Sequence, residues 1–128
     1  MGDYRKLQVW ERAHHLTLEV YQVTRTFPKE ELYGMTSQLR RASASVPANI
    51  AEGCGRIGDA ELARFLSIAL GSAAELDYHL LLVRDLGYLQ SSDYERLAFE
   101  AQGVGKMLAT FIDRIHHPAS QRPTANSQ

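Results

Sequence analysis

Apolar side chains recur every three or four positions along four separate segments of this chain, and no segment alternates as a β-strand would. The clearest case is the last segment, whose apolar positions are Tyr94, Leu97, Ala101, Val104, Leu108, Phe111 and Ile115. This period places one apolar stripe on each helix, and such stripes are buried by packing against one another. Four helices joined by short turns predict an all-α, antiparallel up-down-up-down four-helix bundle.

Turn residues and capping patterns indicate where the helices begin and end. Phe27 should end the first helix, because the residue before a proline is pushed out of the helical region. Asp59 is expected to cap the third helix, and Ser92 with Glu95 forms an expected capping box for the fourth. The predicted helices cover, in order, about residues 7–26, 33–56, 59–86 and 92–115.

The third predicted helix carries a wider apolar face than its neighbours. Two stripes run side by side along it: Leu62, Phe65, Ala69, Leu76 and Val83 form one, and Leu66, Leu70, Ala73 and Leu80 form the other. One neighbouring helix cannot cover a face of that width. The helix is therefore central in the bundle, or another subunit buries part of it.

Pro47 stands well inside the second predicted helix. A proline lacks the backbone N–H, and its ring should clash with the carbonyl of Ser43, at a cost of about 3 kcal/mol. We therefore expect a kink at Pro47 that serves packing or function.

Composition sets limits on class and location. The chain has 128 residues and a formal net charge of −1, so one domain is expected and no global field draws it to nucleic acid or membrane. We predict a four-helix bundle over residues 1–117 and a disordered, polar tail over residues 118–128. The absence of a secretory leader and of an 18-residue apolar run predicts a cytoplasmic protein without a membrane-spanning helix.

Few residues are spaced for catalysis or metal binding. A di-metal carboxylate site in a bundle needs two Glu-x-x-His pairs, and Glu11 with His14 is one such pair while Glu75 and His79 are four apart. The lone cysteine, Cys54, is weighed as a reactive thiol and as a structural residue, with the structural interpretation preferred. We therefore expect no catalytic residue, no metal, no cofactor and no enzymatic activity.

Four arginines surround the second helix and the turn that follows it: Arg40, Arg41, Arg56 and Arg64. Together they could form a local edge that binds the phosphates of RNA or DNA. The alternative is that the last two are occupied by helix ion pairs, Glu52 with Arg56 and Glu61 with Arg64.

Several motifs connect the chain to a known family. They are Leu7-Gln8-Val9-Trp10, Thr36-Ser37-Gln38-Leu39-Arg40-Arg41, Val46-Pro47-Ala48-Asn49-Ile50-Ala51-Glu52-Gly53, Arg64-Phe65-Leu66 and Gly71-Ser72-Ala73-Ala74-Glu75. Over about residues 7–115 the chain resembles the four-helix bundle proteins encoded in intervening sequences of bacterial large-subunit ribosomal RNA genes. The resemblance implies a homopentameric ring. More distantly, the chain resembles the accessory protein of diversity-generating retroelements, a pentamer that binds nucleic acid beside a reverse transcriptase.

Three functions remain open at this point. The first is a non-enzymatic, homo-oligomeric scaffold that contacts RNA or DNA through arginines repeated around the ring. The second is an adaptor that binds another protein and no nucleic acid. The third is a di-metal carboxylate enzyme, against which the missing second Glu-x-x-His pair argues.

Overall fold

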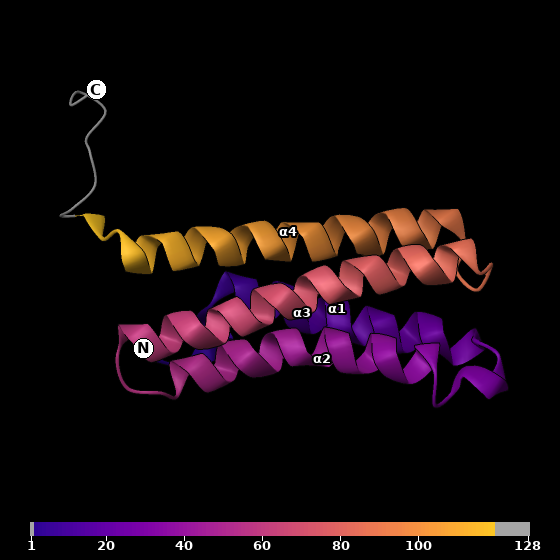
Figure 1. The fold of residues 1–128 in the computed structure, drawn as a ribbon, viewed down its shortest axis with the longest axis horizontal. Helices are drawn as coiled ribbons and strands as arrows, with labels where there is room; N and C mark the ends of the chain where they lie inside the picture. Colours follow the sequence, from indigo (N-terminus) through magenta and orange to yellow (C-terminus); the bar gives the residue numbers. More distant parts are fainter. Residues whose placement is uncertain (1, 120–128) are drawn as a thin grey trace, which may run out of the picture.

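The computed structural model describes residues 2–119, and this part of the chain contains four α-helices and no strand (Figure 1). The helices are α1 (Gln8–Val23), α2 (Met35–Cys54), α3 (Asp59–Asp85) and α4 (Ser91–His116). Short 3-10 helices at Tyr4–Lys6, Thr24–Thr26 and Lys29–Glu31 lie before and after α1. The predicted all-α class is confirmed. The predicted tail lies outside the described residues from residue 120 onward.

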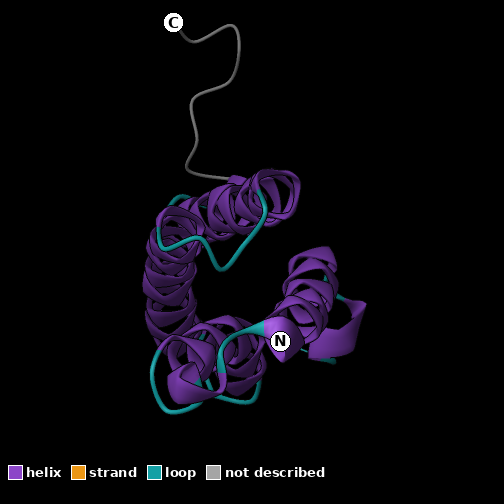
Figure 2. Cartoon of the chain, turned by 90° about the vertical axis from the view of Figure 1, so that its right-hand side faces the viewer, coloured by secondary structure: helices purple, strands orange, loops and turns teal. Residues whose placement is uncertain are grey.

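The helices pack as an antiparallel bundle. Each one contacts the helix before and after it in the chain, and α4 returns to contact α1. Figure 2, a view along the helices, shows them side by side around a common interior. The start of α1 and the end of α4 therefore lie at the same end of the bundle (Figure 1).

The core consists of two clusters of buried apolar side chains, one toward each end of the bundle. Around the end of α3 lie Leu16, Val20, Leu39, Leu76, Leu80 and Leu97, and around its start lie Val9, Val46, Ile50, Leu66, Val104 and Leu108. Each such side chain contributes about 1.5–3 kcal/mol when it is fully buried. These are the stripes that the apolar period predicts, and they hold the helices in place.

Two predicted helix caps are absent. Asp59 is the first residue of α3, and Gly58 precedes it with a φ of 91°, a conformation that favours glycine. Helix α4 begins at Ser91 after Gln90, and no side chain caps its first turn. The observed N-cap, Gln90, is two residues before the predicted one, so Ser92 lies inside the first turn and cannot close a capping box with Glu95.

Pro47 is buried inside α2, which remains helical from Met35 to Cys54. The carbonyl of Ser43 is the group that the missing Pro47 N–H leaves without its helix donor. Thr17 of α1 supplies a donor, since its Oγ1 lies 2.9 Å from the Ser43 oxygen and 3.1 Å from the oxygen of Ala13. A donor from the neighbouring helix thus replaces the hydrogen bond that the Ser43 carbonyl loses to the proline. A kink at Pro47 stays a prediction.

Helix α3 is long and apolar enough to cross a membrane when judged by length and composition alone. Its most apolar 18-residue window has a mean hydropathy of 1.3, and 39% of that window is buried in the bundle. Glu75 and Asp77 interrupt the apolar sequence of α3, and the expectation that no helix spans a membrane stays a prediction. A central helix of a packed bundle meets the same criterion, so this single helix is weak support for a membrane span.

Candidate functional site

The four predicted arginines lie in two pairs near opposite ends of α2. Arg40 and Arg41 are in the second turn of the helix, whereas Arg56 and Arg64 flank the turn that connects α2 to α3. Sixteen residues separate Arg40 from Arg56 in the sequence, which corresponds to about 24 Å along a helix. The structure therefore does not bring all four together into one edge.

Arg56 and Arg64 meet over the ring of Phe65. Their guanidinium carbons lie 5.1 Å and 4.4 Å from the ring centroid. Arg56 also pairs with Glu52 of α2 at 3.2 Å, and Arg64 pairs with Glu61, its neighbour on α3, at 2.9 Å. The hydrogen bond from Arg64 lowers the pKa of Glu61. The two predicted ion pairs are therefore present, and phosphate binding by these arginines is untested.

Arg40 holds the start of α2 against the end of α1. Its Nε donates to Thr24 Oγ1 at 2.9 Å, and its Nη2 donates to the carbonyl oxygen of Tyr21 at 3.4 Å. The guanidinium carbon also lies 4.7 Å from the centroid of the Tyr21 ring. Arg40 is therefore oriented by α1, and its guanidinium stays at the surface beside an aromatic ring.

Arg41 is exposed and has no hydrogen-bond or ion-pair partner among residues 2–119. It lies with Arg40 in a surface groove of about 650 Å³. The groove is lined by Tyr21, Leu32, Tyr33, Thr36, Ser37, Arg40, Arg41, Ala44, Ser45 and Ala48, none of which is acidic. We call it the tyrosine–arginine groove. It offers two cations, two aromatic rings and several hydroxyls on one surface.

The two tyrosines of this groove were not among the predicted site residues. Tyr21 is 43% exposed, although it recurs with Thr17 and Val20 at the helical apolar spacing of α1. Tyr33 is 93% exposed and precedes Gly34, just before α2 begins. The sequence could have indicated this surface through the pair Leu32-Tyr33, because two large apolar residues in a turn have little local structure to bury them.

The surface of α3 that points away from the bundle is apolar. Ile68 and Tyr78 are 42% and 58% exposed, and the exposed positions between them include Gly71 and Ala74. Glu75 and Asp77 are the only charged residues between positions 66 and 83. We call this surface the outer face of α3. The two apolar stripes predicted for this helix are buried in the bundle apart from the half-buried Leu70, so the outer face of α3 lies outside them.

No group of three or more metal-ligating side chains gathers between residues 2 and 119. Glu11 is exposed, and the ring of His14 is stacked on Trp10 with 4.9 Å between centroids. His79 is buried, with its Nε2 3.9 Å from Glu75 and its Nδ1 without a hydrogen-bond partner. Among the described residues, these four side chains therefore do not gather into one metal-ligating group.

Cys54 is buried at the end of α2. Burial raises the pKa of its thiol, because the apolar surroundings disfavour the charged thiolate. A raised pKa keeps the group protonated and unreactive near neutral pH. The structural interpretation of this cysteine agrees with the observed environment.

Comparisons with known proteins identify similar sequences and folds. The family described as 23S rRNA-intervening sequence protein matches residues 5–110. A solved structure of a protein of unknown function from the S23 ribosomal protein family of Bacteroides thetaiotaomicron is similar, with 24% sequence identity and a TM-score of 0.74. The alignment covers 81% of this chain and 97% of that one. At this identity the likeness shows the fold alone. No curated protein matches the chain.

Proposed function

This chain belongs to the 23S rRNA-intervening sequence protein family, and from that premise we propose that it is a non-enzymatic, self-assembling helical scaffold that contacts nucleic acid. The contact is made by the tyrosine–arginine groove and not by all four arginines. Arg56 and Arg64 form ion pairs with Glu52 and Glu61, which leaves them less free to neutralise phosphates.

One observation carries the proposal: the groove combines an unpaired arginine with two exposed aromatic rings and no acidic side chain. Arginine neutralises phosphates and releases counterions. Aromatic rings stack with unpaired bases, and each stacked base is worth about 1–3 kcal/mol. Arg40 adds a second guanidinium that is already held in place by Thr24. Unpaired bases beside a phosphate backbone match this set of groups.

Self-assembly would repeat the tyrosine–arginine groove, which binds nucleic acid only weakly in a single subunit. With a net charge of −1, a single chain has no general attraction for nucleic acid. A ring would repeat the groove once per subunit, and simultaneous contacts raise the overall affinity. The outer face of α3 supports self-assembly, since its exposed apolar side chains lack a cover within the subunit. The homopentamer implied by the family resemblance is the assembly that we propose.

Binding of fluorescently labelled single-stranded RNA, structured RNA and duplex DNA, titrated across salt concentrations, tests this function. We expect tightest binding to unpaired strands, with a linear fall in log affinity against log salt. Arg41→Gln should weaken binding tenfold or more and lower the salt slope by about one phosphate per subunit. Arg64→Gln is the matched control, because Glu61 already occupies that guanidinium. Absence of binding at low salt, or equal losses in the two variants, would contradict the proposal.

A protein-binding adaptor is the second candidate. The observation that favours it is the exposed apolar surface, which includes Leu32 in the groove and Tyr78 on α3. Such surfaces are typical of protein contacts. An assembled protein that binds none of the nucleic acids at low salt would make the adaptor the better hypothesis.

A further inference from the structure

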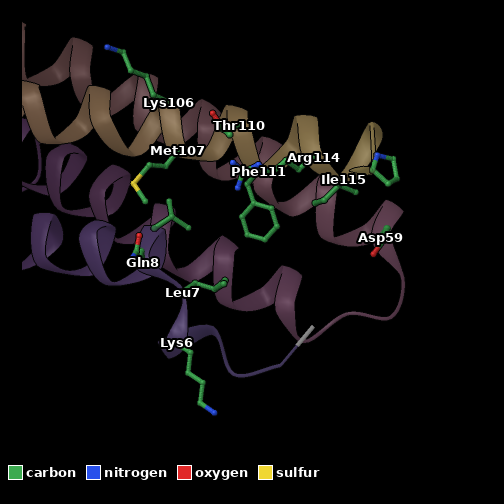
Figure 3. Close-up of a pocket in the computed structure, with 12 residues that line it drawn as sticks. Lys6, Leu7, Gln8, Asp59, Lys106, Met107, Thr110, Phe111, Arg114 and Ile115 are labelled. Atoms are coloured by element: carbon green, nitrogen blue, oxygen red, sulfur yellow. The ribbon is translucent and has the colours of Figure 1, made fainter. Parts of the chain in front are cut away.

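A second hollow lies at the end of the bundle where α1 begins and α4 ends, and it shares no lining residue with the tyrosine–arginine groove. It has a volume of about 740 Å³, and Figure 3 shows it between the first residues of α1 and the last turns of α4. This volume is within the range of small-molecule sites, about 300–1,000 Å³. We call it the end hollow.

The walls of the end hollow are apolar. Leu7 and Val9 come from the start of α1, and Met107, Phe111 and Ile115 come from one side of α4. In Figure 3 the ring of Phe111 extends from α4 into the space on the side of Leu7. Apart from Val9, these side chains are only partly buried, so they pack on the core on one side and remain uncovered on the other.

The rim of the end hollow is basic. Its lining includes Lys6, Lys106 and Arg114, with Asp59 as the one acidic lining residue. None of the three cations has a hydrogen-bond or ion-pair partner among the described residues. Lys6 and Lys106 extend outward on opposite sides in Figure 3, and their flexible stems let the amines reach a charge at the mouth.

We propose that the end hollow binds a single-chain anionic amphiphile, such as a medium-chain fatty acid. The acyl chain lies against Met107, Phe111 and Leu7, and the carboxylate lies at the rim near Arg114. The apolar wall matches an acyl chain. Three cations and only one carboxylate line the hollow, so its net positive charge matches an anionic head group. A neutral hydrocarbon would contact the apolar wall but would leave the cations at the rim without a partner.

This site is independent of the proposed function. Phe111, Arg114 and Ile115 lie beyond residue 110, where the family match ends, and none of the lining residues belongs to the tyrosine–arginine groove. Loss of amphiphile binding and loss of nucleic-acid binding are therefore separate results.

Isothermal titration of the full chain with octanoate, decanoate and laurate, each below its micelle concentration, tests the proposal. Affinity should rise by roughly threefold to fourfold for each added methylene until the hollow is filled. Dodecanol, which has the chain of laurate without its charge, should bind at least tenfold more weakly. Equal binding of laurate and dodecanol, or no dependence on chain length, would overturn the proposal.

Variants locate the binding. Arg114→Glu, at an exposed position, should weaken laurate binding tenfold or more, and Thr110→Trp should block the hollow. Lys29→Glu is the control, since this exposed cation lies at the other end of the bundle. Circular dichroism checks that each variant is folded. Unchanged binding in Thr110→Trp, or an equal loss in Lys29→Glu, would contradict the assignment.

Vesicle binding and oligomer mass, measured beside the laurate titration, separate a free amphiphile from two other occupants. Binding to vesicles that contain phosphatidylglycerol, without binding of laurate, would make the hollow a membrane contact and overturn the proposal. A Thr110→Trp variant with a changed oligomer mass, in a protein that binds no laurate, would make the hollow an interface between copies and also overturn it.

Discussion

The hydroxyl of Thr17 on α1 lies 2.9 Å from the carbonyl oxygen of Ser43 on α2, the acceptor that Pro47 leaves without its helix donor. Both residues are buried, so an unsatisfied carbonyl there would cost about 1–3 kcal/mol. Ser43 does not repair the gap itself, because its own hydroxyl donates to the carbonyl of Arg40 at 3.0 Å. The proline in α2 is therefore tied to a threonine on the neighbouring helix.

This relationship predicts a coupling between two substitutions. Thr17→Val should lower the free energy of unfolding by about 1–2 kcal/mol, because it removes the donor and keeps the shape. In a Pro47→Ala background the restored N–H serves Ser43, so the same substitution should cost clearly less. Urea unfolding of the two single variants and the double variant measures the coupling. Equal costs of Thr17→Val in both backgrounds would show that the hydrogen bond has no link to the proline.

Two glycines should respond differently to alanine. A Cβ at Gly103 would overlap Nη2 of Arg12, whereas a Cβ at Gly105 meets only Leu70 Cδ1, at 3.6 Å, an ordinary contact. Gly105→Ala should raise stability by about 0.5–1 kcal/mol, since alanine favours a helix. Gly103→Ala should gain less than half of that, because Arg12 must move away from α4. Thermal unfolding of both variants compares them, and equal gains would contradict the close approach.

The ion pair between α1 and α4 should make stability depend on pH. Arg12 donates to both carboxylate oxygens of Glu100, at 2.9 Å and 3.1 Å, and these bonds lower the pKa of Glu100 from its ordinary value of 4.5. A carboxylate whose pKa is lower in the folded state stabilises the fold above its unfolded pKa. This contribution is therefore present above about pH 4.5 and is lost as the pH falls through the folded pKa.

Glu100→Gln removes that titration. The side chains are about one-third exposed, so solvent screening limits the effect to about 1 kcal/mol or less. Unfolding free energies measured from pH 7 to pH 3 should fall less steeply in the variant than in the parent protein. Parallel curves would mean that the pair contributes nothing to the acid sensitivity.

Assembly through the outer face of α3 predicts a change in mass. Tyr78→Glu places a charge on this apolar surface and should convert the oligomer to smaller species in light scattering after gel filtration. Leu18→Glu is the matched control, since Leu18 is also an exposed apolar residue but lies on α1. If Leu18→Glu and not Tyr78→Glu reduces the mass, the subunit contact involves α1.

The number of helices, their approximate ranges and the core stripes could be predicted from the sequence. Each of these depends on a local period, and Leu97, Val104 and Leu108 are buried where that period places them. Membership of the intervening-sequence family could also be read from short motifs, and the match over residues 5–110 confirms it. The capping box at Ser92 was wrong because the helix begins two residues earlier, and such a shift changes which side chains can reach the free backbone N–H groups.

The candidate site depended on tertiary structure. The four predicted arginines lie in two pairs. Arg56 and Arg64 both contact the ring of Phe65, whereas Arg40 is oriented by its hydrogen bond to Thr24 after α1. The exposure of Tyr21, despite its place in an apolar period, is likewise set by the rotation of α1 in the bundle.

The sequence by itself determined the helices and which face of each is apolar. Only the packed bundle decided that Thr17 serves Ser43, that Arg12 lies over Gly103 and that the outer face of α3 stays uncovered. The physical reason is that an apolar period is a property of one helix. The register and rotation between helices arise when all four apolar stripes are buried together.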